Sequence, residues 1–120
     1  MIELNMRNYA HLGDAVWELF VRENLVELCK NPQSLHRMTT EKVMGSYQAK
    51  LLEEIEELLT EEEQEIKRRA RNMEVPVARR NNQAEYRQAT AFEALIGYWY
   101  REDKSRLEFI CNKLLKEIKS

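Results

Sequence analysis

The chain has 120 residues, of which 33% are charged and 43% hydrophobic, and it contains only three glycines and two prolines. This length excludes a multidomain enzyme, and the composition favours one mostly helical domain whose core needs no metal or disulfide. Because 19 basic and 21 acidic residues give a net charge of -2, overall charge does not identify a nucleic-acid-binding protein.

The first predicted helix runs from Ala10 to Lys30, where apolar residues recur at three- and four-residue steps. We expect Pro32 to end this segment, since proline disfavours helical geometry in the residue before it. Thr39 or Thr40 is a suitable N-cap for a second helix, whose apolar residues continue at helical spacing to Leu59.

A third helix is predicted to start at Glu61. Thr60 precedes three glutamates, and Glu63 stands at the third helical position, which is the pattern of a capping box. After this helix, the segment of about residues 72–84 has no sustained period and contains proline and several asparagines. We expect it to be a flexible basic loop within a single domain that covers residues 1–120.

Two more helices complete the predicted chain. The fourth covers roughly Glu85 to Tyr100, and the pair Glu102-Asp103 then caps a last amphipathic helix. No alternation of the kind found in strands occurs. The sequence therefore predicts an all-α fold, a helical bundle.

The absence of membrane-span, secretory-signal and metal-ligand patterns in the sequence predicts the cellular compartment. No run reaches the roughly 20 apolar residues of a membrane span, and the N-terminus lacks the basic and apolar regions of a secretory signal. Cys29 and Cys111 lie far apart, without other cysteines or histidines at metal-ligand spacing. We expect a cytoplasmic protein, without a membrane partner, whose cysteines are reduced and lie in the core.

Charge changes abruptly between two neighbouring stretches. From Glu53 to Glu65 the chain carries eight glutamates and no base, which we interpret as a solvated helix face. The following stretch carries six cations and a single acid, Glu74, and such patches commonly bind phosphate backbones. Favourable charge at a helix C-terminus is the alternative explanation. The candidate RNA-binding residues are Lys67, Arg68, Arg69, Arg71, Arg79 and Arg80.

Two segments carry an acid beside a glycine on an apolar helix. Gly13 precedes Asp14 in HLGDAVWE, and Glu93 lies one turn before Gly97 in ATAFEALIGY. Glycine inside a helix costs about 1 kcal/mol relative to alanine, which indicates close approach of another backbone or a ligand. If the helices cross at these glycines, the two carboxylates share one pocket and suit Mg²⁺ or Mn²⁺ rather than zinc. Alternatively, Asp14 simply lies near the positive end of its helix.

These segments resemble the motifs of the ribonuclease III nuclease domain. HLGDAVWELFV is similar to its LGDAVLE signature, and ATAFEALIGYWY to its ADxxEAxxGA acidic motif, so the resemblance covers nearly the whole chain. PQSLHR, ARNMEV and EYRQATAFEALIGY are more similar to the short form called mini-ribonuclease III, which has no appended double-stranded-RNA-binding domain.

The resemblance implies a ribonuclease III-like homodimer that uses Mg²⁺, with Mn²⁺ as a substitute, to cut double-stranded RNA and leave 5′-phosphate ends. It further implies maturation of the ends of large-subunit (23S) ribosomal RNA precursors. Asp14 and Glu93 would be the catalytic and metal-binding residues. The sequence identifies no protein partner other than a second copy and leaves open whether a ribosomal protein stimulates cleavage.

This chain departs from the family at two acidic positions, which Ala10 and Thr90 occupy. Glu18 and the hydroxyl of Thr90 are candidates to support the metal ligands from behind, and both residues could equally be structural. The missing acids leave a non-catalytic RNA-binding module of the same fold as the alternative function. A helical scaffold whose acids are structural is a third.

Aromatic and histidine residues give two further expectations. His11 precedes Asp14 on the same helix and could reach substrate, but we expect it to pack on its apolar helix. The apolar area of the first helix, together with Trp17, Phe20, Trp99 and Tyr100, exceeds what a monomer of five helices needs. This excess predicts a two-fold dimer.

Overall fold

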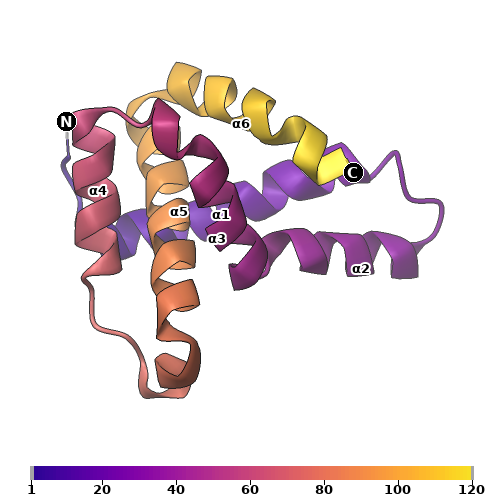
Figure 1. Cartoon of the computed structure of the whole chain (residues 1–120). Helices are drawn as coiled ribbons and strands as arrows, with labels where there is room; N and C mark the ends of the chain where they lie inside the picture. Colours follow the sequence, from indigo (N-terminus) through magenta and orange to yellow (C-terminus); the bar gives the residue numbers. More distant parts are fainter. Residues whose placement is uncertain (1, 120) are drawn as a thin grey trace.

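The structure, a computed structural model, describes residues 2–119. Its helix α5 occupies the centre, where it crosses α1 and packs against α3 and α4 (Figure 1). The described residues contain no strand, so the prediction of an all-α fold is confirmed. The helices are α1 (Met6–Leu25), α2 (Pro32–Val43), α3 (Gly45–Ile55), α4 (Glu61–Arg71), α5 (Gln83–Glu102) and α6 (Lys104–Lys119), with short 3-10 helices η1 (Glu56–Leu58) and η2 (Val77–Asn82).

Pro32 opens a helix instead of ending one. The preceding helix α1 already ends at Leu25, and Pro32 takes the first position of α2. Asn31 is the N-cap, because its side-chain oxygen accepts from the backbone N–H of Ser34 at 2.8 Å. Proline is tolerated at this position since its missing N–H would have no partner in the first turn. The prediction that this proline terminates a long first helix is therefore wrong.

The predicted second helix is in fact two helices, α2 and α3. The chain is extended at Met44, with φ of -67° and ψ of 148°, and α3 begins at Gly45. Neither threonine caps a helix start: Thr39 is buried within α2, and the Thr40 hydroxyl donates to the carbonyl of His36 at 2.8 Å. The hydrophobic period continues across the break, which is why periodicity alone did not reveal it.

The later helix starts agree with the sequence. Thr60 and Glu63 form the predicted capping box, with hydrogen bonds of 2.8 and 3.2 Å. Asp103 caps α6 by accepting from the backbone N–H of Arg106 at 3.1 Å. The predicted loop contains η2 over residues 77–82, and its flexibility stays a prediction.

The two tryptophans belong to the core of the monomer. Trp17 is fully buried, packs edge-on against Phe92 at 5.0 Å between ring centres, and donates to the carbonyl of Lys42 at 2.9 Å. Trp99 is also fully buried. The tryptophans therefore belong to the core and do not contribute to the apolar excess from which the sequence predicts a dimer, whereas Phe20 and Tyr100 remain partly exposed.

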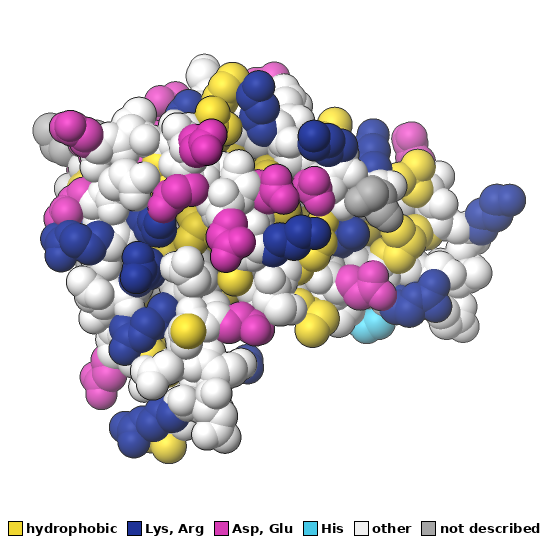
Figure 2. Space-filling view, viewed as in Figure 1, with side chains coloured by type: hydrophobic (Ala, Val, Ile, Leu, Met, Phe, Trp, Pro, Cys, Tyr) yellow, Lys and Arg dark blue, Asp and Glu magenta, His cyan; other side chains and the backbone are white. Residues whose placement is uncertain are grey.

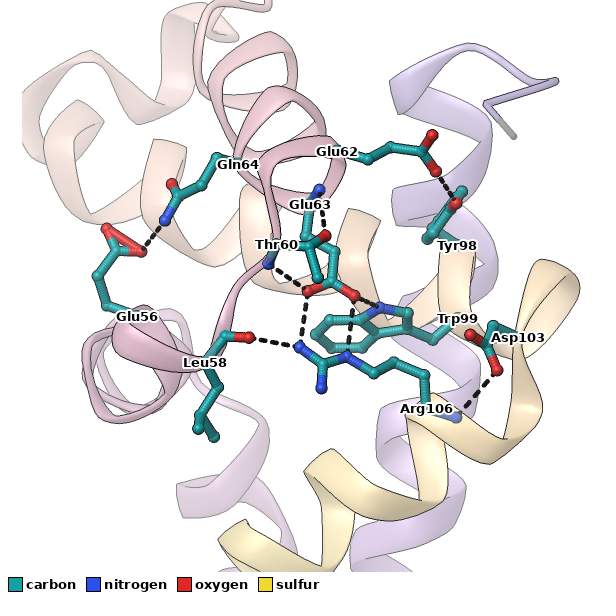
Figure 3. Close-up of polar contacts among 10 residues, drawn as sticks. All are labelled: Glu56, Leu58, Thr60, Glu62, Glu63, Gln64, Tyr98, Trp99, Asp103 and Arg106. Carbon is teal, nitrogen blue, oxygen red and sulfur yellow. Dashed lines mark hydrogen bonds and ion pairs between the residues drawn. The ribbon is translucent and has the colours of Figure 1, made fainter.

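A second buried feature, the Glu63 cluster, ties α4, α5 and α6 together (Figure 3). Glu63 is 5% exposed and accepts from the indole N–H of Trp99 at 2.8 Å and from Arg106 at 2.8 and 2.9 Å. Arg106 also donates to the carbonyl of Leu58 at 2.5 Å. Burial favours a higher pKa for Glu63, but hydrogen bonds from Arg106, Thr60 and Trp99 outweigh it and lower that pKa. The acidic stretch is thus only partly a solvated face.

The cysteines are both free, and they differ in burial. Cys111 lies in the core, and burial raises the pKa of its thiol to about 12. Cys29 is only partly buried, with its sulfur 3.3 Å from that of Met38. Across residues 2–119, no helix combines the length and apolarity that crossing a membrane requires.

Candidate active site

The crossing of α1 and α5 depends on two glycines. A Cβ atom on Gly13 would lie 1.8 Å from the carbonyl oxygen of Glu93, and one on Gly97 would lie 1.9 Å from that of Tyr9. These neighbours are backbone atoms, so any side chain would force the helices apart. The predicted close approach of the two helices is confirmed.

This approach places Asp14 and Glu93 on the wall of one cavity. The Asp14 cavity, of about 310 Å³, is also lined by Ala10, His11 and Thr90. Asp14 is exposed, whereas Glu93 is partly buried beside it. Burial raises the pKa of Glu93 to about 8, and the neighbouring carboxylate of Asp14 adds to the rise. Within residues 2–119, no ion pair provides a cation to either carboxylate.

The donor set fits a hard divalent cation. No group of three or more His, Cys, Asp or Glu able to hold a metal occurs within the described chain. Mg²⁺ commonly takes one or two protein carboxylates and completes its shell with water and substrate phosphates. Asp14 and Glu93 provide two adjacent carboxyl groups, and burial together with the charge of Asp14 makes ionised Glu93 costly until a cation is present.

Two arginines and a histidine line the cavity that contains this pair. Arg7 and His11, both exposed on α1, line the Asp14 cavity together with Arg87 of α5. Arg87 also donates to the carbonyls of Arg71 and, at 3.1 Å, Met73, where the chain leaves α4. The expectation that His11 packs in an apolar interior is wrong, because the crossing turns its face of α1 toward this cavity.

Gln48 is a neighbour of Glu93 that the sequence analysis missed. It is 2% exposed, and its amide Nε2 donates to Oε2 of Glu93 at 3.3 Å. A second cavity, the Gln48 cavity of about 440 Å³, is lined by Gln48, Arg79 and Asn82 and shares Thr90 and Glu93 with the Asp14 cavity. Gln48 precedes the buried Leu51 and Leu52 of α3 by one turn. A polar residue on that apolar face is the signal that could have revealed it.

The two candidate supporting residues differ. Glu18 pairs with Arg22 at 2.5 Å and does not line either of these cavities. Thr90 lines both cavities, about one helical turn before Glu93. We therefore retain only Thr90 as a candidate to support the site.

The basic residues do not form a uniform surface. Lys67, with a side chain only 11% exposed, pairs with Glu56, so it is removed from the RNA-binding set. Arg68 pairs with Glu65 at 2.7 Å but is 61% exposed. Lys and Arg side chains gather along the edge formed by α4 and η2 (Figure 2). The exposed members of the predicted set are Arg68, Arg69, Arg71, Arg79 and Arg80.

Known proteins share both this sequence and this fold. Residues 7–104 match the family model described as "Ribonuclease III domain". The Mini-ribonuclease 3 of Gloeobacter violaceus is 46% identical over 107 residues, covering 89% of this chain and 79% of the relative. The Mini-ribonuclease 3 of Enterococcus faecalis is 38% identical over 121 residues, covering 97% of this chain and 92% of the relative. A crystal structure of a Fusobacterium nucleatum protein, 33% identical, superposes with a TM-score of 0.85 over 98% of this chain and 95% of that one. The chain therefore belongs to the ribonuclease III family and, within it, to the mini-ribonuclease 3 proteins.

Proposed function

We propose that this ribonuclease is a Mg²⁺-dependent endonuclease that cuts double-stranded RNA and leaves 5′-phosphate ends. One observation carries the proposal: a crossing that admits no side chain at Gly13 or Gly97 brings Asp14 and Glu93 to one cavity without a cationic partner. A carboxylate pair of this kind reduces stability unless a cation joins it, so its presence favours catalysis over a purely structural role.

The chemistry follows from the arrangement of these side chains. Asp14 and Glu93 present oxygen atoms to the cation, and Mn²⁺ could replace Mg²⁺ on the same donors. When bound, the cation lowers the pKa of a water and offsets negative charge on the phosphate in the transition state. Water attacks phosphorus and the 3′ oxygen leaves, which gives a 5′-phosphate and a 3′-hydroxyl. Arg7, exposed at the cavity, can hold a phosphate of the same strand.

The exposed arginines of α4 and η2 support binding of the duplex backbone. Arg79 lines the Gln48 cavity, so the basic edge reaches a second cavity that Glu93 also lines. Proteins recognise A-form RNA through its phosphates and shape, because its deep major groove hides the base edges. Contacts of this kind suit paired ends of ribosomal RNA precursors, including the 23S precursor, in the cytoplasm.

Cutting both strands requires a second copy of the chain. An apolar groove lined by Val16, Leu19, Phe20, Tyr100 and Leu107 lies between α1 and α6, beside the last turn of α5. Leu19 is 59% exposed there. We propose this groove as the dimer surface, in place of the buried tryptophans. Sedimentation at micromolar concentration should then give about twice the chain mass of 14.4 kDa.

The function is tested with one long duplex in RNA and DNA form and its single RNA strand, each with and without Mg²⁺. We expect cleavage of the RNA duplex alone, only with Mg²⁺, and 5′-phosphate on the products. Binding of duplex RNA without cleavage at any Mg²⁺ or Mn²⁺ concentration would instead identify a non-catalytic RNA-binding module, in which Ala10 and Thr90 mark the loss of catalysis. If the protein neither binds nor cuts the duplex, the helical scaffold with structural acids is the interpretation that remains.

A further inference from the structure

We propose that Gln48 is a positioning residue that holds Glu93 in the orientation needed for metal binding. The inference rests on the proposed function, because it concerns the carboxylate that would bind the cation. Gln48 itself touches neither the cavity shared with Asp14 nor the reacting atoms, so it would act through Glu93.

The contact is fixed by the fold of α2 and α3. The break at Met44 starts a new helix at Gly45, and Gln48 lies in its first turn, with its backbone N–H bonded to the carbonyl of Met44 at 3.0 Å. Its side chain is 2% exposed and donates to Oε2 of Glu93. A buried side chain has few alternative rotamers, so the donor stays in place.

Glu93 has space on both sides and therefore needs such a contact. Its side chain lines the Asp14 cavity and the larger Gln48 cavity, of about 310 and 440 Å³. A carboxylate free to rotate would divide its time between them, and only one orientation places it with Asp14. Fixing one oxygen from the side of α3 selects the orientation in which both carboxylates face the same cavity.

A neutral amide suits this task better than a cation. The Arg106 guanidinium at Glu63 fixes a carboxylate but also neutralises it. The amide of Gln48 fixes one oxygen of Glu93 and leaves the negative charge for the divalent ion. Residues that orient metal ligands from behind commonly change metal affinity or activity by about 10- to 100-fold when mutated.

The test replaces Gln48 by methionine, which keeps nearly the same length and removes the amide. We expect Gln48→Met to lower kcat on duplex RNA by about 10-fold or more and to raise the Mg²⁺ concentration for half-maximal rate, with KM for RNA nearly unchanged. A second readout needs no catalysis: Mn²⁺ is titrated and followed by the rise in Tm. Gln48→Met should need about 10-fold more Mn²⁺ for the same rise.

Gln88→Met is the matched control. Gln88 is partly buried on α5, its amide oxygen has no partner among the described residues, and it lies at a cavity with Leu52, Glu56 and Lys67. Loss of the Gln88 amide should leave kcat and the Mn²⁺ midpoint unchanged. Gln48→Asn, which keeps an amide that is one methylene too short, provides a second variant and should resemble Gln48→Met.

The outcomes separate this inference from the proposed function. Wild-type kcat and Mn²⁺ midpoint in Gln48→Met or Gln48→Asn would overturn the role of Gln48, as would equal losses in Gln88→Met. If the wild type does not cut RNA with any metal, the proposed function fails, and the Mn²⁺ titration still decides whether Gln48 positions Glu93.

Discussion

Glu63 and Glu93 both lie between packed helices, but they have opposite neighbours. Glu63 accepts from Arg106, Trp99 and Thr60, and these hydrogen bonds hold its pKa below the ordinary value. Glu93 is partly buried beside Asp14, with the Gln48 amide as its donor, and its pKa is raised to about 8.

The difference separates a carboxylate that stabilises the fold from one that we propose takes part in the chemistry. A buried carboxylate that is paired with a cation and fully hydrogen-bonded, as Glu63 is, holds neighbouring helices together. A buried acid that faces another acid costs stability until a cation from solution arrives, and strongly shifted pKa values of this kind cluster at functional sites. The four predictions below test this contrast.

The largest effect should come from removing a charged oxygen at the crossing. Asp14→Asn and Glu93→Gln should each reduce RNA cleavage by at least about 100-fold, because an amide cannot supply the negative ligand. Circular dichroism and duplex binding should change little, since each replacement nearly conserves volume. Glu27→Gln, an exposed acid just beyond α1, is the control. Activity within a few-fold of wild type in either site variant would refute the assignment.

The Glu63 cluster should respond in stability instead. Arg106→Met leaves Glu63 buried without its cation and should lower the free energy of unfolding by about 3 kcal/mol. Arg68→Met breaks an exposed pair and should change the free energy of unfolding little. Urea denaturation followed by circular dichroism measures both. Equal losses in the two variants would show that Glu63 does not depend on its guanidinium partner.

Lowering the pH should change the contributions of the two glutamates to folding stability in opposite directions. The folded pKa of Glu93, about 8, exceeds its ordinary 4.5, so folding binds a proton and this group lowers stability as pH rises from about 4.5 to 8. Glu63 has a lowered pKa, so its contribution is present above its unfolded pKa and is lost as pH falls through the folded pKa.

Glu93→Gln should therefore stabilise the metal-free protein at pH 8 by more than about 1 kcal/mol and much less at pH 5. Thermal unfolding at the two pH values, with a chelator present, measures the effect. A variant less stable than wild type at pH 8 would mean that Glu93 contributes to folding as Glu63 does.

The smallest effect concerns the basic edge. Arg79→Ala with Arg80→Ala should weaken duplex binding across unrelated sequences and flatten the log-log salt slope by about two units or less. Metal binding and Tm should stay the same because both side chains are exposed. Hydrogen exchange should find the 72–84 segment more protected with RNA than without it. Wild-type binding at physiological salt would place the RNA on another surface.

Several helix ends and the central acids of the site were predictable because their sequence signals are local. The capping box at Thr60, the cap at Asp103 and the two glycine-acid pairs each depend on a few neighbouring residues. A glycine in an apolar helix has few explanations other than close approach, so Gly13 and Gly97 indicated the crossing.

The rest depended on contacts between residues far apart in the chain. The residues near Gln48 do not reveal that the first turn of α3 contacts Glu93, and nothing near Glu63 reveals Arg106, which is 43 positions away. The burial of Lys67 and the exposure of His11 likewise depend on which face a neighbouring helix covers. The sequence alone predicted the helical segments, the later caps and the pair of acids, because these follow from local geometry. Tertiary packing decided the break at Met44, gave Glu63 its cation, and placed Glu93 beside Asp14 in the pair that we propose as the metal site.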